Sequence, residues 1–358
     1  MLANNNKRVP NVEHSTMVSY PTELFHIQIL DKCEKYGDKI ALTDSSGDLT
    51  FQEVFELSYR FAFLLHSEGI QKGDSLLVCL HNSSWYPIVF LGSALLGATI
   101  SGIHPDSTTD YKNINYFTHV PCICIGDAIE NSVISVPRDL PKLLNPQKSK
   151  EDEKGDVFGL RTPQINLDDV LIMPFSSGTS GKPKCVMLTH KNYNAATSIL
   201  KSALFDQLVT ESQRRTIAML PFHHGSGFWA LLFCLLEGCQ TIIMHHFHPM
   251  IMLEMIQKYK VDTINIVPSV LGYLSRMPTQ NFDISSLKTV LCGSSPLGKG
   301  ISQTFLEKFP SVENLIQGAF KIVLLSHISP LGKSVVHEQR LGSCGKLLPG
   351  YEAKFSSV

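Results

Sequence analysis

A run of hydroxyl, glycine and lysine residues, Phe-Ser-Ser-Gly-Thr-Ser-Gly-Lys-Pro-Lys, occupies residues 175–184 between two apolar segments. Glycine lets backbone N–H groups converge without a clash from Cβ, and concave sets of N–H groups bind anions. Lys182 and Lys184 add positive charge. The composition is typical of a polyphosphate-binding loop, although the same residue types also make ordinary solvated turns. A Walker P-loop is excluded, because Pro183 follows Gly181-Lys182 where that motif needs Ser or Thr.

Two later blocks combine small residues with groups that can contact a ligand. Residues 221–228 read Pro-Phe-His-His-Gly-Ser-Gly-Phe, and the imidazole of His224 can orient a carboxylate and respond to its charge. A capped turn with two exposed histidines is the simpler interpretation of this block. Residues 292–297 read Cys-Gly-Ser-Ser-Pro-Leu, which leaves space for a ligand at the end of a strand or forms a plain turn. Gln317 and Gly318 begin a fourth short block.

Together these blocks resemble the adenylate-forming (AMP-binding) superfamily, which includes acyl-CoA synthetases, 4-coumarate–CoA ligases and luciferases. Residues 176–190, Ser-Ser-Gly-Thr-Ser-Gly-Lys-Pro-Lys-Cys-Val-Met-Leu-Thr-His, resemble its phosphate-loop signature, with Cys185 at the usual glycine. The Phe-His-His-Gly block is similar to the 4-coumarate ligase and luciferase branch. The resemblance covers about residues 20–355 and implies His224 as the catalytic residue beside the substrate carboxylate. It implies that ATP is held by Ser176, Ser177, Gly178, Thr179, Ser180, Gly181, Lys184, Gly293, Ser294, Ser295, Gln317 and Gly318.

The family resemblance also implies a two-step reaction with ATP, Mg²⁺ and coenzyme A. A small-molecule carboxylic acid, fatty or aromatic, would attack the α-phosphorus of ATP and release pyrophosphate. The thiol of coenzyme A would then attack the acyl-adenylate. We therefore expect an ATP-dependent carboxylic acid–CoA ligase.

One departure from the family pattern affects this expectation. After Gln317-Gly318 the family has Tyr-Gly-x-Thr-Glu, whereas this chain continues Ala319-Phe320-Lys321. The Thr and the Glu that supports Mg²⁺ are missing, and no counterpart of the small C-terminal domain with its catalytic lysine precedes the stop at Val358. The departure predicts an impaired, truncated ligase with a degraded Mg²⁺ site; the alternative is a non-catalytic remnant that binds acyl groups, nucleotide or another protein.

Composition narrows the class of protein. The 358 residues carry 31 Lys and Arg against 32 Asp and Glu, so no global charge recruits nucleic acid. Nine cysteines without a CxxC pair favour a reducing, cytoplasmic location, with a peroxisomal location open to a longer form.

His245 and His248 lack the further ligands of a metal site, so no metal site is predicted. Residues 85–103 are interpreted as a buried helix and strand and not as a transmembrane segment. The sequence does not define an oligomeric state.

The order of expected elements predicts an α/β fold: two stacked αβ subdomains with mixed, largely parallel sheets. We expect a disordered segment at 1–20, a first subdomain at 21–144, a charged linker at 145–169 and a second subdomain at 170–358. A hairpin is expected over 39–51, followed by a helix that Thr50 and Glu53 cap and that ends before Gly69. Further strands are expected near 75–80, 122–125, 170–175, 186–189, 216–220, 240–244, 263–267 and 289–292, and further helices near 192–205, 228–236, 252–259 and 300–309.

Overall fold

The computed structural model describes residues 19–105, 162–175, 184–208, 212–318, 326–329, 331, 341–343 and 345–351. It also describes the backbone of residues 12–13, 122–126, 176, 319–321, 324–325 and 352–353. Most of the segment expected to be disordered (1–20) and residues 145–161 of the expected linker lie outside these ranges. Within the former, β1 (Val12–Glu13) pairs antiparallel with β18 (Glu352–Ala353).

The smaller of the two main sheets has five strands in the order β10-β7-β5-β4-β6. β4 pairs in parallel with both β5 and β6, β7 is parallel to β5, and β10 is antiparallel to β7. Their bounds are β4 Ser75–Cys79, β5 Thr99–Gly102, β6 Cys122–Gly126, β7 Val170–Ile172 and β10 Leu188–Thr189. Strands from both sides of the expected linker therefore share this sheet.

The larger sheet has nine strands in the order β17-β16-β15-β14-β13-β11-β12-β2-β3. The strands from β15 to β2 in this order are parallel to one another. Antiparallel pairing adds β3 to β2 at one end, and β16 to β15 and β17 to β16 at the other. The expected mixed, largely parallel α/β architecture is confirmed. The bounds are β2 Ile40–Asp44, β3 Gly47–Thr50, β11 Arg215–Ala218, β12 Gln240–Ile243, β13 Thr263–Ile266, β14 Thr289–Gly293, β15 Asn314–Lys321, β16 Leu324–Ile328 and β17 Lys346–Leu347.

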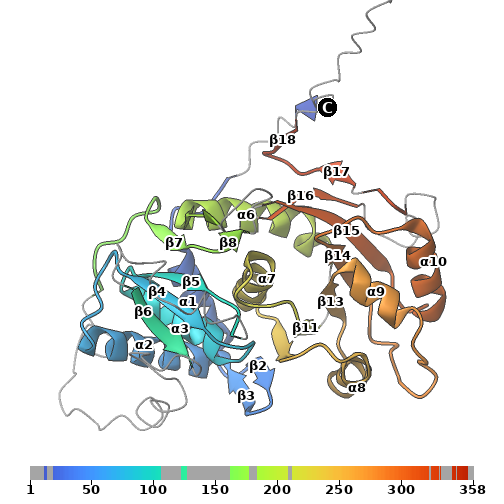
Figure 1. The fold of residues 1–358 in the computed structure, drawn as a ribbon, viewed down its shortest axis with the longest axis horizontal. Coiled ribbons are helices and arrows are strands. Elements are labelled where there is room, and N and C mark those ends of the chain that lie inside the picture. Colours follow the sequence, from blue (N-terminus) through green and yellow to red (C-terminus); the bar gives the residue numbers. More distant parts are fainter. Residues whose placement is uncertain are drawn as a thin grey trace, which may run out of the picture.

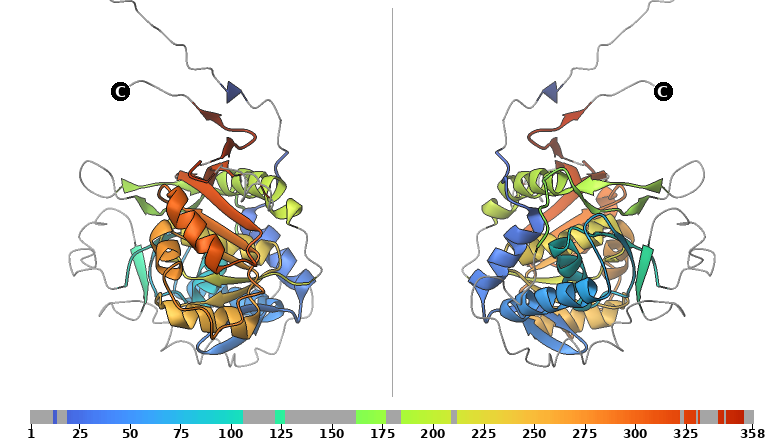
Figure 2. Two further views of the ribbon diagram at one scale, coloured as in Figure 1. Left: turned by 90° about the vertical axis from the view of Figure 1, so that its right-hand side faces the viewer. Right: turned by 90° about the vertical axis from the view of Figure 1, so that its left-hand side faces the viewer.

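A layer of helices packs between the two sheets, with α7 near the centre of the molecule (Figure 1). It contains α1 Phe25–Tyr36, α2 Phe51–Ser67, α3 Trp85–Leu95, α6 His190–Ala203 and α7 Gly225–Leu236, with the short η3 Phe205–Gln207 after α6. A second apolar cluster joins the other face of the nine-stranded sheet to α8 Pro249–Tyr259, α9 Pro268–Leu274 and α10 Lys299–Lys308. The side views show these outer helices stacked against that sheet (Figure 2).

Local sequence signals explain several boundaries. At the start of α2 the N–H of Glu53 donates to Thr50 Oγ1 at 3.1 Å, and the N–H of Thr50 donates to Glu53 Oε2 at 2.7 Å, which is the expected capping box. After α2, Gly69 has φ +86° and its N–H donates to the carbonyl of His66. The left-handed conformation at this glycine ends the helix.

The uncharged stretch at 85–103 forms α3 and β5, as expected. Ten of the eleven α3 residues are buried, and so are all four residues of β5. Gly92 allows α3 to approach α2, because a Cβ atom there would lie 2.9 Å from the carbonyl oxygen of Ser58. Among the helices that the structure describes, none combines the length and apolar character needed to cross a bilayer.

Candidate active site

The carboxyl ends of parallel strands bring the sequence blocks to one edge of the nine-stranded sheet. Gly293 at the end of β14 stands directly beside Gly318 in β15, and Cys292 stands beside Gln317. His224 lies in the segment that follows β11, which is separated from β14 only by β13. Ligands bind at this edge in open α/β sheets. The fold therefore assembles three of the four predicted blocks along one edge.

The phosphate-loop candidate is built on a hairpin. β8 (Phe175–Ser176) pairs antiparallel with β9 (Lys184–Cys185), so that Ser176 stands opposite Lys184. Lys184 is exposed. The turn between these strands, including Ser177, Gly178, Thr179, Ser180 and Gly181, lies outside the described residues.

Cys185, which replaces the family's usual glycine, is compatible with this hairpin because it lies in an extended strand. Its Sγ atom donates to the carbonyl oxygen of Met173 at 3.3 Å and lies 3.9 Å from Ser101 Oγ. Burial raises the pKa of its thiol. The side chain therefore anchors the hairpin base to β5.

The base of the hairpin lies against the turn that carries His224. Pro174 precedes β8, and its carbonyl accepts from the N–H of Val186 on the returning strand at 3.0 Å. A Cβ atom added at Gly225 would lie 3.9 Å from Cβ of Pro174. The phosphate-loop candidate and the His224 turn are thus neighbours in space.

His224 caps the N-terminus of α7. Its Nδ1 atom accepts from the N–H of Ser226 at 3.3 Å and lies 2.9 Å from Ser226 Oγ, and the residue is exposed. The N-terminal end of a helix favours negative charge. An imidazole and a helix N-terminus together make this position suitable for a carboxylate. The simpler interpretation, a capped turn with two exposed histidines, holds for His224 but not for His223, which is only partly exposed and packs against His104.

A close backbone approach explains why residue 227 of the same block is a glycine. A Cβ atom there would lie 2.3 Å from the carbonyl oxygen of Pro221 and 2.6 Å from that of Leu220. Only glycine lets the first turn of α7 approach the preceding backbone this closely.

Asn82, in the segment after β4, fixes this turn from the other sheet. Its Nδ2 atom donates to the carbonyl of Leu220 at 3.0 Å, and its Oδ1 atom accepts from the N–H of Phe222 at 2.8 Å. Asn82 is buried, so both hydrogen bonds are shielded from water. No sequence motif pointed to Asn82; the available signal was a polar residue shortly after the buried strand β4.

Four histidines meet near this turn from the ends of strands in both sheets. The rings of His104 and His223 lie 4.8 Å apart between centroids, and those of His81 and His246 lie 5.3 Å apart. Burial, followed by the neighbouring histidines, lowers the pKa of His223 to about 4. In the part of the chain that the structure describes, no group of three His, Cys, Asp or Glu side chains is arranged to hold a metal ion. His245 and His248 are exposed, and His248 caps α8.

The predicted ATP-binding residues outside the hairpin differ in exposure. Ser294 and Ser295 are exposed, and Ser294 has φ +72°, an uncommon conformation for a residue with a side chain. Gln317 is buried, and its Oε1 atom has no hydrogen-bond partner within the described residues. β15 then continues through Ala319 to Lys321 and pairs antiparallel with β16.

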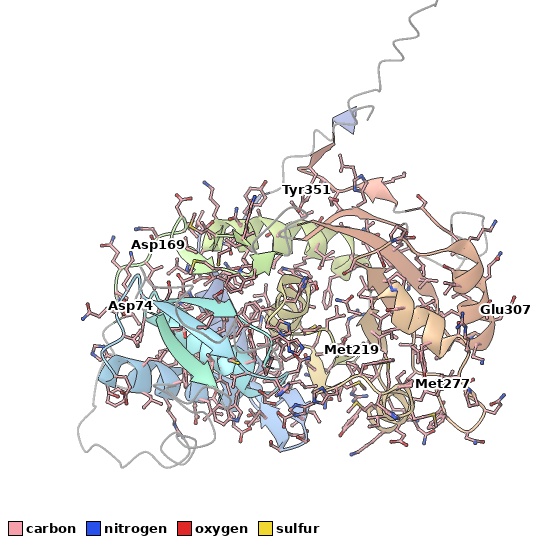
Figure 3. All side chains as sticks on the ribbon, viewed as in Figure 1. Asp74, Asp169, Met219, Met277, Glu307 and Tyr351 are labelled. Atoms are coloured by element: carbon pink, nitrogen blue, oxygen red, sulfur yellow. The ribbon has the colours of Figure 1, made fainter. Side chains whose placement is uncertain are left out.

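A cavity of about 80 Å³ lies between α6, α7 and the nine-stranded sheet. Leu220, Phe222 and Gly227 line it at the His224 turn, and Arg214 and Phe205 line it elsewhere. Met219, also in the lining, lies near the centre of the molecule beside β11 (Figure 3). The lining therefore includes residues on both sides of His224 in the chain, but not His224 itself.

Residues 29–356 match the family described as AMP-binding enzyme. In sequence, the chain is 32% identical over 323 residues to 4-coumarate–CoA ligase 1 of Petroselinum crispum, a match that covers 80% of this chain and 55% of the relative. In structure, it is similar to a long-chain-fatty-acid–CoA ligase from Archaeoglobus fulgidus, with a TM-score of 0.77, 20% identity and coverage of 94% of this chain and 72% of that chain.

The inhibitor-bound N-terminal domain of FACL13 from Mycobacterium tuberculosis gives a TM-score of 0.75 at 20% identity, over 91% of this chain and 82% of that chain. At this identity the two structures support the fold alone. The chain spans about half the length of the curated relatives it matches, with 55% of the first covered. The family match, by contrast, extends over residues 29–356. On that match, the chain belongs to the AMP-binding enzyme family.

Proposed function

We propose that this chain is an ATP-dependent carboxylic acid–CoA ligase with impaired catalysis, which binds ATP and a small carboxylic acid side by side. The observation that carries the proposal is the contact between the two candidate binding elements. Pro174 at the base of the phosphate hairpin lies against Gly225, the residue after His224. A nucleotide held by the hairpin and a carboxylate held at His224 would then be neighbours.

In the proposed reaction, a carboxylate oxygen attacks the α-phosphorus of ATP, the bond to the β-phosphate oxygen breaks, and pyrophosphate leaves. The thiol of coenzyme A then loses its proton to solvent, its sulfur attacks the acyl carbon, and AMP leaves with the electrons of the broken bond. His224 and the N-terminus of α7 would orient the carboxylate. Lys184 and the hairpin N–H groups would offset the negative charge that accumulates between two anions.

Magnesium prefers carboxylate and other oxygen ligands. The residues that follow Gly318 are Ala319, Phe320 and Lys321, and none of them offers a side-chain oxygen. This segment does not fit the Mg²⁺ site that the family resemblance implied. Loss of one group that stabilises a transition state commonly costs about 10²–10³ in rate. We therefore expect slow adenylation, and the same segment favours nucleotide and acid binding without turnover as the second candidate function.

Two measurements test this proposal. Isothermal titration calorimetry with ATP should show binding that Lys184→Ala weakens about tenfold, equivalent to about 1.4 kcal/mol. Lys191→Ala is the matched control, because Lys191 is an exposed lysine on α6 whose Nζ lies 3.7 Å from Asp168. Equal effects of the two substitutions would argue against the hairpin as the nucleotide site.

Single-turnover experiments with excess protein, labelled ATP and octanoic or 3-phenylpropanoic acid test the chemical step. We expect ATP binding, with adenylation so slow that no acyl-adenylate is detected. A rapid burst of adenylate would refute the slow-adenylation expectation and leave the ligase assignment in place. Absence of ATP binding would refute the proposed function itself.

A reducing compartment such as the cytosol belongs to the same proposal. Cys33, Cys79, Cys185, Cys234, Cys239 and Cys292 are all free thiols. Free thiols persist where cellular reductants maintain them.

A further inference from the structure

Two cysteines come together where α7 ends. The N–H of Gly238 donates to the carbonyl of Leu235 at 3.2 Å, and Gly238 has φ +73°. The N–H of Cys239 donates to the carbonyl of Cys234 at 2.9 Å. These two hydrogen bonds and the left-handed glycine make a Schellman motif, in which the residues at the two ends of the turn contact one another. In this chain both of those residues are cysteines.

The backbone hydrogen bond places Cys234 and Cys239 within the range of a disulfide. An N···O distance of 2.9 Å between their main chains leaves the two Cα atoms about 5–6 Å apart, and disulfides join Cα atoms at about that separation. The thiols are also hydrogen-bonded to each other, and this bond, followed by burial, holds the pKa of Cys239 well above its usual range. Cys239 therefore keeps its proton and donates it toward the sulfur of Cys234.

The two thiols differ in exposure to an oxidant. Cys239 is 1% exposed, whereas Cys234 is half-buried. Both line the cavity of about 80 Å³ beside α7. A buried water molecule needs about 10–15 Å³ of such space, so hydrogen peroxide, about twice the size of water, fits in this cavity. An oxidant therefore reaches Cys234 first, with Cys239 directly behind it.

We propose that Cys234 and Cys239 form a reversible disulfide when the reduced chain encounters a hydroperoxide. The Cys234 thiol first loses its proton to solvent, and its sulfur attacks a peroxide oxygen. The S–O bond forms, the O–O bond breaks, and the hydroxide that leaves takes up a proton to become water. The product is a sulfenic acid on Cys234, which condenses with a neighbouring thiol.

The second step closes the disulfide. The Cys239 thiol loses its proton, its sulfur attacks the sulfenic sulfur of Cys234, and the S–O bond breaks. The departing hydroxide takes up a proton and leaves as a second water molecule. In total the two thiols give up two electrons, and one molecule of hydrogen peroxide is reduced to two of water.

The disulfide would join the last turn of α7 to the strand that follows it. Cys239 directly precedes β12, and His224 caps the opposite end of α7. Oxidation therefore acts on the helix whose first turn carries His224. The inference goes beyond the proposed function and does not depend on it, because the reaction needs no bound nucleotide or acid.

Peptide mapping of the full chain tests the inference. Reduced protein is treated with hydrogen peroxide, alkylated with N-ethylmaleimide in urea and cleaved with trypsin. The tryptic peptide 216–258 contains Cys234 and Cys239 and no other cysteine. A disulfide should make this peptide lighter by two hydrogen atoms and block its alkylation, and dithiothreitol should restore both thiols. Cleavage after Glu237 separates the two cysteines, so the fragments stay together only through the S–S bond.

Cys292 is the control within the same sample. It is 1% exposed, and burial raises the pKa of its thiol to about 12. We expect peptide 216–258 to be oxidised at least about tenfold faster than Cys292, because access and thiolate character set the rate. Equal rates for the two peptides would overturn the inference.

Two variants assign the steps to the two thiols. Cys239→Ala should stop at the sulfenic acid on Cys234, which dimedone traps, and Cys234→Ser should leave Cys239 unoxidised. In the native chain, full alkylation of both cysteines after peroxide, a disulfide from either one to a different cysteine, or a sulfinic acid on Cys234 would overturn the inference. Mapping of the native chain needs no variant, so it remains decisive even where a substitution prevents folding.

Discussion

His26 of α1 and His190 of α6 bury their imidazole rings against one another, with centroids 5.1 Å apart. The N–H of Phe25 donates to His190 Nδ1 at 3.2 Å, which requires this nitrogen to be unprotonated. Burial, followed by the charge of His190, lowers the pKa of His26 to about 3, and burial lowers the pKa of His190 to about 4. The helical layer that supports the site therefore depends on two neutral histidines.

The first prediction concerns the pH dependence of stability. Below pH 6.5 both histidines are protonated in the unfolded chain but neutral in the folded one, so unfolding takes up protons. Their contribution is complete above about pH 6.5 and declines as pH falls toward 4, by up to about 1.4 kcal/mol per pH unit for each histidine. Urea unfolding at pH 7.5, 6.0 and 5.0 measures this slope.

A pair of variants assigns this slope to the buried pair. His26→Gln should make the slope clearly shallower, whereas His66→Gln, at an exposed position on α2, should not change it. A free energy of unfolding that stays constant from pH 6.5 to 5.0 in the native chain would contradict the prediction.

The second prediction uses two glycines in the same helix turn. Gly227→Ala places a methyl group 2.3 Å from the carbonyl oxygen of Pro221, so the backbone must move. We expect a loss of about 1–3 kcal/mol in the free energy of unfolding, as in other overpacked sites. Gly225→Ala meets only Pro174 at 3.9 Å and should change stability by less than about 0.5 kcal/mol. Chemical denaturation of both variants makes the comparison, and similar losses would show that the close approach at Gly227 is not the cause.

The sequence predicted those features of the fold that short-range signals control. The capping box at Thr50 and Glu53 and the glycine at position 69 mark the ends of α2, and the structure confirms both. The arrangement of strands was not predictable in this way. β2 pairs with β12, so that Leu42 stands beside Thr241, and no local pattern encodes a pairing across this separation.

The candidate site was likewise predictable only where its residues are contiguous in the sequence. The composition of the hairpin and of the His224 block was visible in the sequence because each block is contiguous. Asn82 was not, because its role arises from hydrogen bonds to residues 138 and 140 positions away. Likewise, the Gly293 and Gly318 blocks were separate in the sequence, and only the parallel register of β14 and β15 brings them together.

The third prediction tests how Asn82 holds the His224 turn. Asn82→Ala leaves the N–H of Phe222 and the carbonyl of Leu220 without their partner in a buried position. We expect a loss of about 2–4 kcal/mol. Asn82→Asp keeps the acceptor but not the donor, so its free energy of unfolding should lie between those of the native chain and Asn82→Ala. Asn281→Ala, at an exposed position, is the control. A thermal or urea melt in which Asn82→Ala behaves like Asn281→Ala would remove Asn82 from this role.

The fourth prediction separates stability from function at Gln317. Its buried Oε1 atom has no partner in the described structure, so Gln317→Leu removes an unpaired acceptor and should leave the free energy of unfolding unchanged or raise it by up to about 1 kcal/mol. If Gln317 contacts the nucleotide, the same variant should weaken ATP binding about fivefold to tenfold, the effect of one hydrogen bond.

Gln240→Leu is the matched comparison for this substitution. Gln240 lies in β12 of the same sheet, but its Nε2 atom donates to Thr43 Oγ1 at 3.1 Å. That variant should lose stability, because Thr43 is left without this donor, and should keep its affinity for ATP. Calorimetry with ATP and urea unfolding therefore give opposite patterns for the two glutamines. A Gln317→Leu protein that binds ATP normally would exclude Gln317 from the nucleotide site.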